Sequence, residues 1–354
     1  MGAAPVPRQP PGGLGAGPHD PVSKEPFLSE ESNASTGRRP AVSIIIVSYN
    51  SREWLQDCLD AIPAAAGALE TEIVIVDNAS VDGSAEFIEG AYPGVRLLRN
   101  RSNAGFAKAV NQGAAVANGR YVLLLNPDGH LKPNAIEALV AFAESDPRHA
   151  IVGGRTLNQH GQYDPRSCWA APSLWSLFCN ATLLSTIFPG SRLFDPETMG
   201  WFRRDRPMTV DIVSGCLMLV ATQDWRALGG LDEKYFVYGE DADICLRARA
   251  RLGRTCAITP DAQMVHAVSA SSQSKPAKLI LLLNGRIALV MTHFPRWKAA
   301  LGRWLIIAGV WLRAVLGKLG FVSGKSWQEV WRERHRWSRG YQPIVPGDGS
   351  VAPG

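Results

Sequence analysis

The 354-residue sequence lacks several features that would identify its class directly. It has only six cysteines and no C-x-x-C pair, so neither a zinc ribbon nor a disulfide framework is expected, and a reducing compartment is the plain interpretation. No G-x-G-x-x-G follows the first apolar run, and no G-x-x-x-x-G-K-[ST] loop occurs. A bound nucleotide would therefore be held by side chains and not by a glycine-rich loop.

Long uncharged apolar runs are also missing. The longest run near the C-terminus covers nine residues, 304–312, between Arg303 and Arg313. A membrane-spanning helix needs about 20 apolar residues. The N-terminal segment has no apolar core behind its charges, so no secretion signal is expected. These absences predict a cytoplasmic chain that does not cross a membrane.

Charge is distributed unevenly along the chain. The net charge is +5, but residues 278–339 contain twelve Lys or Arg, two acids and six of the eleven tryptophans. Tryptophan mixed with basic residues suits the headgroup region of an anionic membrane surface. We therefore expect an interfacial helix on the inner leaflet, with a core-packing or dimer helix as the alternative. Basic clusters without a recognisable binding fold do not indicate nucleic acid.

Composition divides the chain into four regions. Residues 1–40 contain eight prolines, six glycines and one aromatic side chain, which predicts a disordered leader. Residues 41–275 are expected to form the folded catalytic domain and residues 276–340 a basic, amphipathic, membrane-associating helical region. Residues 341–354 are expected to be a disordered tail. Residues 155–208, rich in Trp, Phe and Pro, fit no clear period.

Strand-like and helical patterns alternate from residue 42 onward. The run 42–47 is apolar enough for a strand buried on both faces, as in a parallel sheet. Further strand-like runs lie at 73–76, 95–98 and 121–125. A helical stretch at 54–62 precedes the first of these runs, and another at 104–117 precedes the last. This order predicts right-handed βαβ units and hence an α/β fold, with a mostly parallel, Rossmann-like sheet flanked by helices.

Polar residues follow each of the four predicted strands. Ligands of open parallel sheets bind beyond the carboxyl ends of the strands, so these residues form a candidate site. Asn, Asp and Ser also follow strands because they make turns, and at any single position this alternative is favoured. Four polar strand ends in succession favour a binding site. They are Ser48, Tyr49 and Asn50; Asp77 and Asn78; Asn100 and Asn103; and Asn126 with Asp128.

Several segments together resemble the family 2 glycosyltransferases with the GT-A fold. They are, in order, VSIIIVSYNS, EIVIVDNASVDGS, NRSNAGFAKAVNQG, YVLLLNPDG, DIVSGCLMLV and GGLDEKYFVYGEDADICLRARARLG. The resemblance covers about residues 41–272. Within the family, the N-P-D and Y-G-E-D-A-D variants look most like actinobacterial and O-antigen-type rhamnosyltransferases, which extend a polyprenyl-diphosphate-linked sugar.

The resemblance implies an inverting, metal-dependent transferase of cell-envelope glycan synthesis. The expected donor is dTDP-rhamnose, and the expected acceptor is polyprenyl-diphosphate-linked or a polysaccharide. A UDP-sugar-dependent galactofuranosyl or N-acetylhexosaminyl transferase is the alternative enzyme, and a non-catalytic sugar-nucleotide-binding membrane scaffold is the alternative class. A sugar nucleotidyltransferase is disfavoured because S-Y-N-S lacks a glycine-rich, lysine-bearing loop. A homodimer is left open.

The resemblance also assigns residues to the donor and to a metal ion. Asp77 would accept a hydrogen bond from the pyrimidine imide, or, as the alternative, only cap its own turn. Asp128 is the expected ligand of Mg²⁺ or Mn²⁺, and His266 is a second ligand or a structural residue. The remaining expected donor-binding residues are Ser48, Tyr49, Asn50, Asn78, Asn103, Asn111, Asn126 and Gly215.

The acid cluster at residues 240–243 is the expected catalytic centre. By the family motif Asp241 would take the proton of the acceptor hydroxyl, and Glu240 would hydrogen-bond the acceptor. The alternative is helix electrostatics, because acids favour the first turn of a helix. Asp243 can pair with Arg247, which lies four residues later. Arg247 itself is expected to lie on a solvated face of the helix.

Overall fold

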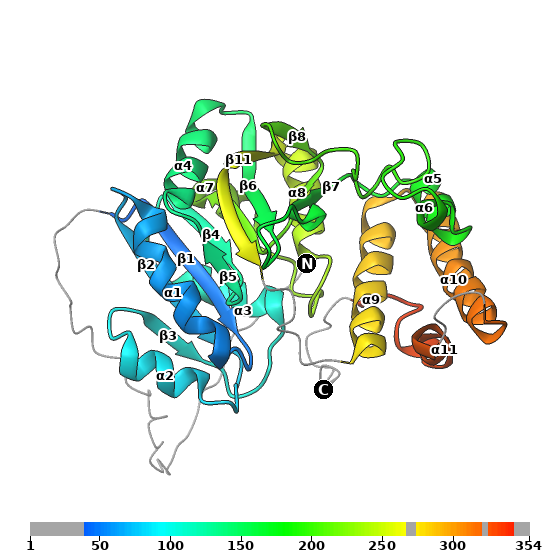
Figure 1. Cartoon of the computed structure of the whole chain (residues 1–354), viewed down its shortest axis with the longest axis horizontal. Coiled ribbons are helices and arrows are strands. Elements are labelled where there is room, and N and C mark those ends of the chain that lie inside the picture. Colours follow the sequence, from blue (N-terminus) through cyan, green and yellow to red (C-terminus); the bar gives the residue numbers. More distant parts are fainter. Residues whose placement is uncertain (1–38, 267–273, 321–324, 343–354) are drawn as a thin grey trace, which may run out of the picture. The chain divides into compact units, whose positions relative to one another are not determined.

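The computed structural model describes residues 39–266, 274–320 and 325–342. The predicted leader (1–40) and tail (341–354) lie almost wholly outside the described residues. Within the described ranges the chain forms a mixed sheet, helices on both of its faces, and a separate group of C-terminal helices (Figure 1).

The first half of the sheet is parallel, as predicted. Its strands lie in the order β3-β2-β1-β4, and each neighbouring pair is parallel. The strands are β1 (Val42–Ser48), β2 (Thr71–Asp77), β3 (Arg96–Arg99) and β4 (Tyr121–Leu125), and the helices that connect them are α1 (Arg52–Ala66), α2 (Ser84–Ala91) and α3 (Phe106–Ala115).

The second half of the sheet contains antiparallel strands that the sequence did not reveal. Strand β10 (Leu217–Ala221) lies antiparallel between β4 and β6 (His149–Leu157), and β6 pairs in parallel with β11 (Thr255–His266). Strands β5 (Gly129–Leu131) and β8 (Met208–Val210) are antiparallel to β11. Apolar periodicity predicts a strand but not its direction, because burial is the same either way. A two-stranded sheet pairs β7 (Cys168–Trp169) with β9 (Ile212–Val213).

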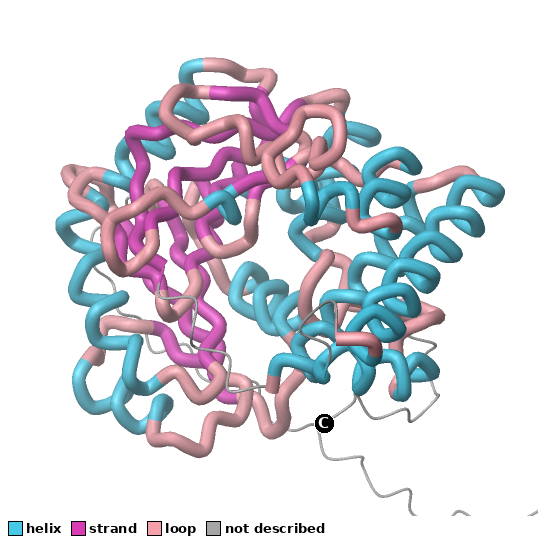
Figure 2. The backbone as a smooth tube through the Cα atoms, turned by 45° about the vertical axis from the view of Figure 1, so that its right-hand side comes forward, coloured by secondary structure: helices cyan, strands magenta, loops and turns pink. Residues whose placement is uncertain are grey.

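Two apolar cores cover the faces of the sheet. Alternate residues of β1 point to opposite faces, so Ile45 and Val47 join one core, whereas Ile44 and Ile46 join the other. Figure 2 shows the strands with helices on both sides. The first core is completed by α3, α7 (Thr222–Leu228) and α8 (Glu240–Leu252), and the second by α1, α2 and α4 (Ala135–Ser145).

A third core joins the C-terminal helices to part of the segment 155–208. Gly309 of the long C-terminal helix lets the backbone of Ala181 approach closely, since an added Cβ would lie 2.8 Å from the Ala181 Cα. Trp337 is fully buried there and donates its indole N–H to the Val330 carbonyl, so this tryptophan does not face a membrane. The helices of this group are α5 (Leu174–Ala181), α6 (Leu184–Ile187), α9 (Lys275–His293), α10 (Arg296–Lys318) and α11 (Lys325–Arg332).

Helix α10 differs from the expectation that no segment is long and apolar enough to span a membrane. It has 23 residues, and its most apolar window reaches a mean hydropathy of 1.6, which satisfies length and composition for a span. Within the protein 44% of that window is buried, which a core helix also shows. Helix formation places the apolar residues on either side of Arg303 and Arg313 in one continuous element.

All six cysteines are free and buried.

Candidate active site

The ends of β1 and β2 place Ser48 and Asp77 side by side, because these two residues are partners in the parallel register. Asp77 uses one carboxylate oxygen, Oδ2, to accept the Ser80 N–H at 3.0 Å. The other, Oδ1, is buried without a partner among the described residues, and so is the Ser48 hydroxyl. Asp77 thus forms the turn named as its alternative role and also keeps a free acceptor, which buried polar atoms rarely do.

A cavity of about 220 Å³ lies at these strand ends. Five of the predicted residues line it, and the loop that precedes α8 closes it with Phe236, Val237 and Tyr238. Gly105 permits this closure: its φ is +83°, and an added Cβ would lie 2.6 Å from the Phe236 carbonyl oxygen. The predicted residues in the lining are Tyr49, Asn78, Asn103, Asn126 and Asp128.

Two predicted donor-binding side chains are engaged elsewhere. The Asn111 side chain donates to the Leu231 carbonyl and accepts the Leu231 N–H, both at 2.9 Å, so it fastens α3 to the loop after α7. Asn50, with φ of +53°, accepts the Val81 N–H at 2.9 Å and so holds the loop after β2. Neither residue lines the cavity.

Gly215, expected among the donor-binding residues, contacts Asp241 through its backbone. Its N–H donates to Asp241 Oδ2 at 3.1 Å. An added Cβ would contact the Asp241 Cβ at 3.5 Å, which is ordinary van der Waals distance. Packing inside the protein therefore does not require glycine here, and the contribution that the structure does show is the backbone donor.

Asp128 and His266 meet because β5 pairs with β11, which sets His266 opposite Gly129. The His266 Nε2 lies 3.2 Å from Asp128 Oδ1 and 3.3 Å from Asn126 Nδ2. A carboxylate oxygen and an imidazole nitrogen facing each other can bind one divalent cation. In the described part of the chain no group of three or more His, Cys, Asp or Glu side chains could hold a metal ion. The pair therefore fits a cation that completes its shell with water and substrate oxygens, as Mg²⁺ does.

The acid cluster forms the first turn of α8. Asp241 accepts two backbone N–H groups, from Ala242 at 2.8 Å and from Gly215 at 3.1 Å. Burial raises the pKa of Asp241, and these two hydrogen bonds oppose the rise because they favour the charged carboxylate. Asp241 is thus a partly buried, oriented carboxylate with the properties of a general base.

Glu240 has the opposite character. It is buried and its Oε2 has no hydrogen-bond partner among the described residues. Burial first, and the charge of Asp241 second, raise its pKa well above the usual range. Of these two adjacent carboxyls, Glu240 is therefore the one whose charged form is the more strongly disfavoured.

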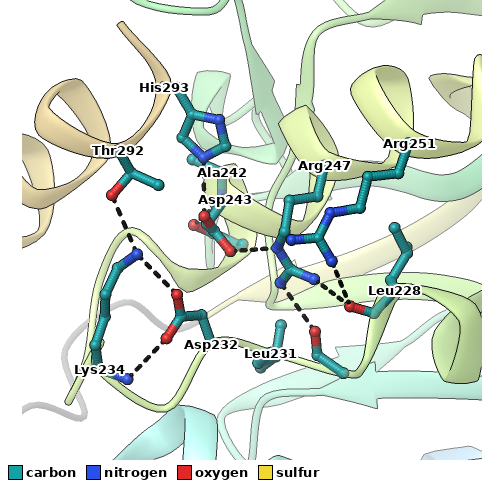
Figure 3. Close-up of polar contacts among 12 residues, drawn as sticks. Leu228, Leu231, Asp232, Lys234, Ala242, Asp243, Arg247, Arg251, Thr292 and His293 are labelled. Atoms are coloured by element: carbon teal, nitrogen blue, oxygen red, sulfur yellow. Dashed lines mark hydrogen bonds and ion pairs between the residues drawn. The ribbon is translucent and has the colours of Figure 1, made fainter. Parts of the chain in front are cut away.

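Asp243 joins α8 to its neighbours and does not face the cavity. Its carboxylate pairs with Arg247 Nε at 2.6 Å and with His293 Nε2 of α9 at 2.8 Å (Figure 3). Burial raises the pKa of Asp243, but the His293 hydrogen bond and the Arg247 charge outweigh it and leave the pKa below its usual range. The predicted pairing is confirmed. Arg247, however, is buried and donates to the Leu228 and Gly230 carbonyls, so the expected solvated face is wrong.

The segment before β10 connects the two halves of the site. Gly215 donates to Asp241, and the carbonyl of the next residue, Cys216, accepts the Asn126 N–H at 3.1 Å. Burial raises the pKa of the Cys216 thiol to about 12, and the charges of both Asp241 and Asp128 add to the rise. Two neighbouring residues of this segment therefore bond to the Asp241 side chain and to the Asn126 backbone.

Asp128 and Asp241 nevertheless line different cavities. Asp241 lines a second cavity, of about 520 Å³, and Tyr238 borders both. Tyr238 has a φ of +69°, which is rare for a bulky residue and is typical of functional loops. No pattern in the sequence indicated the backbone conformation of this tyrosine.

Comparisons with known proteins agree with this geometry. Residues 43–207 match the family described as glycosyl transferase family 2, a range that ends before Glu240, Asp241 and His266. An N-acetylglucosaminyl-diphospho-decaprenol L-rhamnosyltransferase of Mycobacterium tuberculosis is 28% identical over 295 residues, 77% of this chain and 91% of that protein. A low-salt glycan biosynthesis hexosyltransferase of Haloferax volcanii, Agl10, is 27% identical over 59% of this chain and 61% of its own.

Solved structures share the fold. The mannosyltransferase PcManGT from Pyrobaculum calidifontis, in complex with GDP-Man and Mn²⁺, aligns with a TM-score of 0.51 at 18% identity, over 85% of this chain and 86% of that one. GalNAc-T7 with UDP, GalNAc and Mn²⁺ aligns with a TM-score of 0.52 at 15% identity, over 85% of this chain and 55% of that one. With the sequence match, this fold identifies residues 43–207 as a glycosyl transferase family 2 domain and the chain as a glycosyltransferase with the GT-A fold.

Proposed function

We propose that the protein is an inverting glycosyltransferase that depends on a divalent cation. The observation that carries this proposal is the position of Asp241, a partly buried carboxylate held by two backbone N–H groups, one of them from Gly215, whose neighbour Cys216 accepts the N–H of Asn126 in the Asn126–Asp128–His266 group. A base on one side and a cation site on the other suit attack from the face opposite the departing diphosphate, which inverts the sugar's anomeric carbon.

Each residue has a defined task in this reaction. Asp77 Oδ1, buried and free, accepts the imide N–H of a pyrimidine. Asp128 and His266 hold the cation, which when bound neutralises the charge that develops on the diphosphate. Asp241 takes the proton of the attacking hydroxyl, and Glu240, which keeps its own proton, donates a hydrogen bond to the acceptor sugar.

For the substrates we propose L-rhamnose from a dTDP donor, with UDP sugars second, and a lipid-linked or polysaccharide acceptor of the cell envelope. The support is the likeness to the mycobacterial L-rhamnosyltransferase over most of both chains. A carboxylate that reads only the imide accepts thymine and uracil equally, so Asp77 agrees with either donor.

The decisive experiment replaces Asp241 by Asn. The protein is incubated with dTDP-rhamnose and UDP sugars, with Mn²⁺ or with EDTA, and release of nucleoside diphosphate is measured with a prenyl-linked acceptor. Because a general base contributes about 10²- to 10⁴-fold, D241N should lose transfer by that factor while its donor affinity stays near wild type. The control, D205N, changes an exposed acid and should transfer normally. Full activity of D241N would refute the proposal.

We propose further that the protein attaches peripherally to the inner face of the membrane. Trp297, Trp304 and Trp311 are spaced by seven residues on α10, which places them on one face, and all three are exposed, Trp304 by 62%. Exposed lysines such as Lys298 lie beside this stripe. Indole rings beside cations match the headgroup layer.

Replacement of Trp304 by Ser should weaken sedimentation with phosphatidylglycerol vesicles severalfold, because one large interfacial side chain is lost. The control W175S changes another exposed tryptophan, 43% exposed, that lies on α5. Equal sedimentation of W304S and wild type would contradict attachment through this stripe.

A further inference from the structure

The second cavity, of about 520 Å³, is formed between the catalytic turn and the C-terminal helices. One wall is the start of α8, with Tyr238, Gly239 and Asp241. The other walls come from α9, α10, α11 and the region of α5 and α6, elements that pack on one another around the third apolar core (Figure 1). The cavity therefore borders both the proposed base and the C-terminal helices.

Much of the lining of this cavity is apolar. It includes Leu279, Leu282 and Leu283 of α9 and Ile306 and Val310 of α10. Leu282 is 40% exposed, so the apolar wall continues to the protein surface. A cavity with such a lining favours an apolar ligand, since each buried methylene contributes about 0.8 kcal/mol.

Two arginines lie in the same lining, and they differ in their partners. Arg286 forms an ion pair with Glu197 at 2.7 Å. Arg313 is only 9% exposed, and among the described residues it pairs with no acid. It donates to the Gly309 and Asn180 carbonyls and lies over the Trp327 ring. Burial, and then the charge of Arg286, lower the pKa of Arg313 to about 10.

A buried guanidinium without a counter-ion is costly, because carbonyl dipoles replace only part of its hydration. A ligand can supply the missing negative charge, and arginine suits phosphates because its planar fork donates two parallel hydrogen bonds. The cavity thus combines an unmatched cation, an apolar wall open to the surface and the proposed base.

We propose that this cavity binds the acceptor, an anionic prenyl lipid whose phosphate contacts Arg313 and whose chain lies along Leu279, Leu282 and Ile306. The proposal rests on the proposed function. The sugar on the lipid extends from the phosphate toward Asp241, and its hydroxyl meets the donor at Tyr238, which borders both cavities. The α5–α6 region therefore serves the acceptor.

The test measures binding of farnesyl diphosphate to the full-length protein by titration calorimetry, with no donor present. Wild type should bind. R313Q should bind at least about tenfold more weakly, because a charge-assisted bidentate contact is lost. L282E should also bind weakly, because it places a negative charge on the apolar wall; Leu282 is partly exposed, so this change leaves the core intact. The control K132Q changes an exposed cation that lines neither cavity and should bind as wild type does.

Two further ligands separate the contributions. Farnesol, which lacks the phosphates, and inorganic pyrophosphate, which lacks the chain, should each bind more weakly than farnesyl diphosphate. Of these two ligands, only pyrophosphate should lose affinity in R313Q. R313K, which keeps the charge, should recover part of the affinity, and this recovery excludes loss of folding as the explanation of R313Q.

Three results would overturn the proposal. The first is that farnesyl diphosphate does not bind to wild type, and the second is that it binds to R313Q and L282E as tightly as to wild type. The third is that phosphatidylglycerol vesicles displace it at equal phosphate concentration. The last result would mean that the cavity takes any anionic lipid. Hydrolysis of the nucleotide sugar by wild type, measured in parallel, separates failure of the acceptor-cavity proposal from failure of the proposed function. Hydrolysis without lipid binding refutes the acceptor cavity alone, whereas absence of hydrolysis with every donor refutes the proposed function.

Discussion

The donor side and the acceptor side of the site are built in different ways. The donor side consists of strand ends: Ser48, Asp77 and Asp128 follow β1, β2 and β4, and the sheet fixes their spacing. The acceptor side consists of helices from distant segments, joined to the catalytic turn by a few contacts. This difference indicates that the donor side depends on the register of the sheet, whereas the acceptor side depends on how α9 packs against α8.

The largest effect is expected at Asp243, which ties these two helices together through His293. D243N should lower the free energy of unfolding by about 3 kcal/mol, because Arg247 and His293 lose a buried partner. The native pKa of Asp243 lies below its unfolded value, so its stabilisation is present above pH about 4 and is lost as the pH falls through the native pKa.

Urea unfolding at several pH values checks this. The difference in the free energy of unfolding between wild type and D243N should be largest at pH 7 and should decrease below pH 4. The control D146N removes an acid whose Arg148 partner is exposed, so it should cost at most about 1 kcal/mol. A gap that does not change with pH would show that the charge of Asp243 is not what stabilises the contact.

The next effect concerns the donor side alone. D77N should reduce affinity for the pyrimidine nucleotide by about 1.5–3 kcal/mol, since hydrogen bonds to charged groups contribute this much. Titration with dTDP and UDP measures it, and the affinity of the protein for farnesyl diphosphate should not change. If dTDP binding were unaffected, Asp77 would have only its turn role with Ser80.

The smallest effect is expected where α9 touches the catalytic turn. A Cβ on Gly285 would collide with the Tyr238 carbonyl oxygen, so G285A should cost about 1–3 kcal/mol and displace the turn. Transfer to the prenyl acceptor should fall more than donor hydrolysis does. The matched helix change G90A meets nothing within 4 Å and should be neutral or stabilising. Equal losses of transfer and hydrolysis in G285A would show that the two sides are not separable.

The positions of the site residues were predicted best where these residues lie at strand ends. Asp77, Asp128 and Asn103 were predicted from strand ends and the family motif, and their positions follow because parallel strands end at one edge. Asn111 was misassigned because it lies in a helix, where only the tertiary partner, here Leu231, decides what an amide contacts. Arg247 was misjudged for a similar reason: a row of arginines at alternating positions looks solvated until the packing of α8 is known.

By itself the sequence determined the alternating strands and helices, the polar strand ends and the acid cluster, because these depend on local periodicity and on short motifs. Only the tertiary structure decided the antiparallel placement of β10, the burial of Trp337, and the meeting of Arg313 with Asp241 around one cavity. The physical reason is the range of the contacts. Local patterns fix what a segment becomes, whereas a contact between distant segments, such as that of Asp243 with His293 50 residues away, is set by tertiary packing.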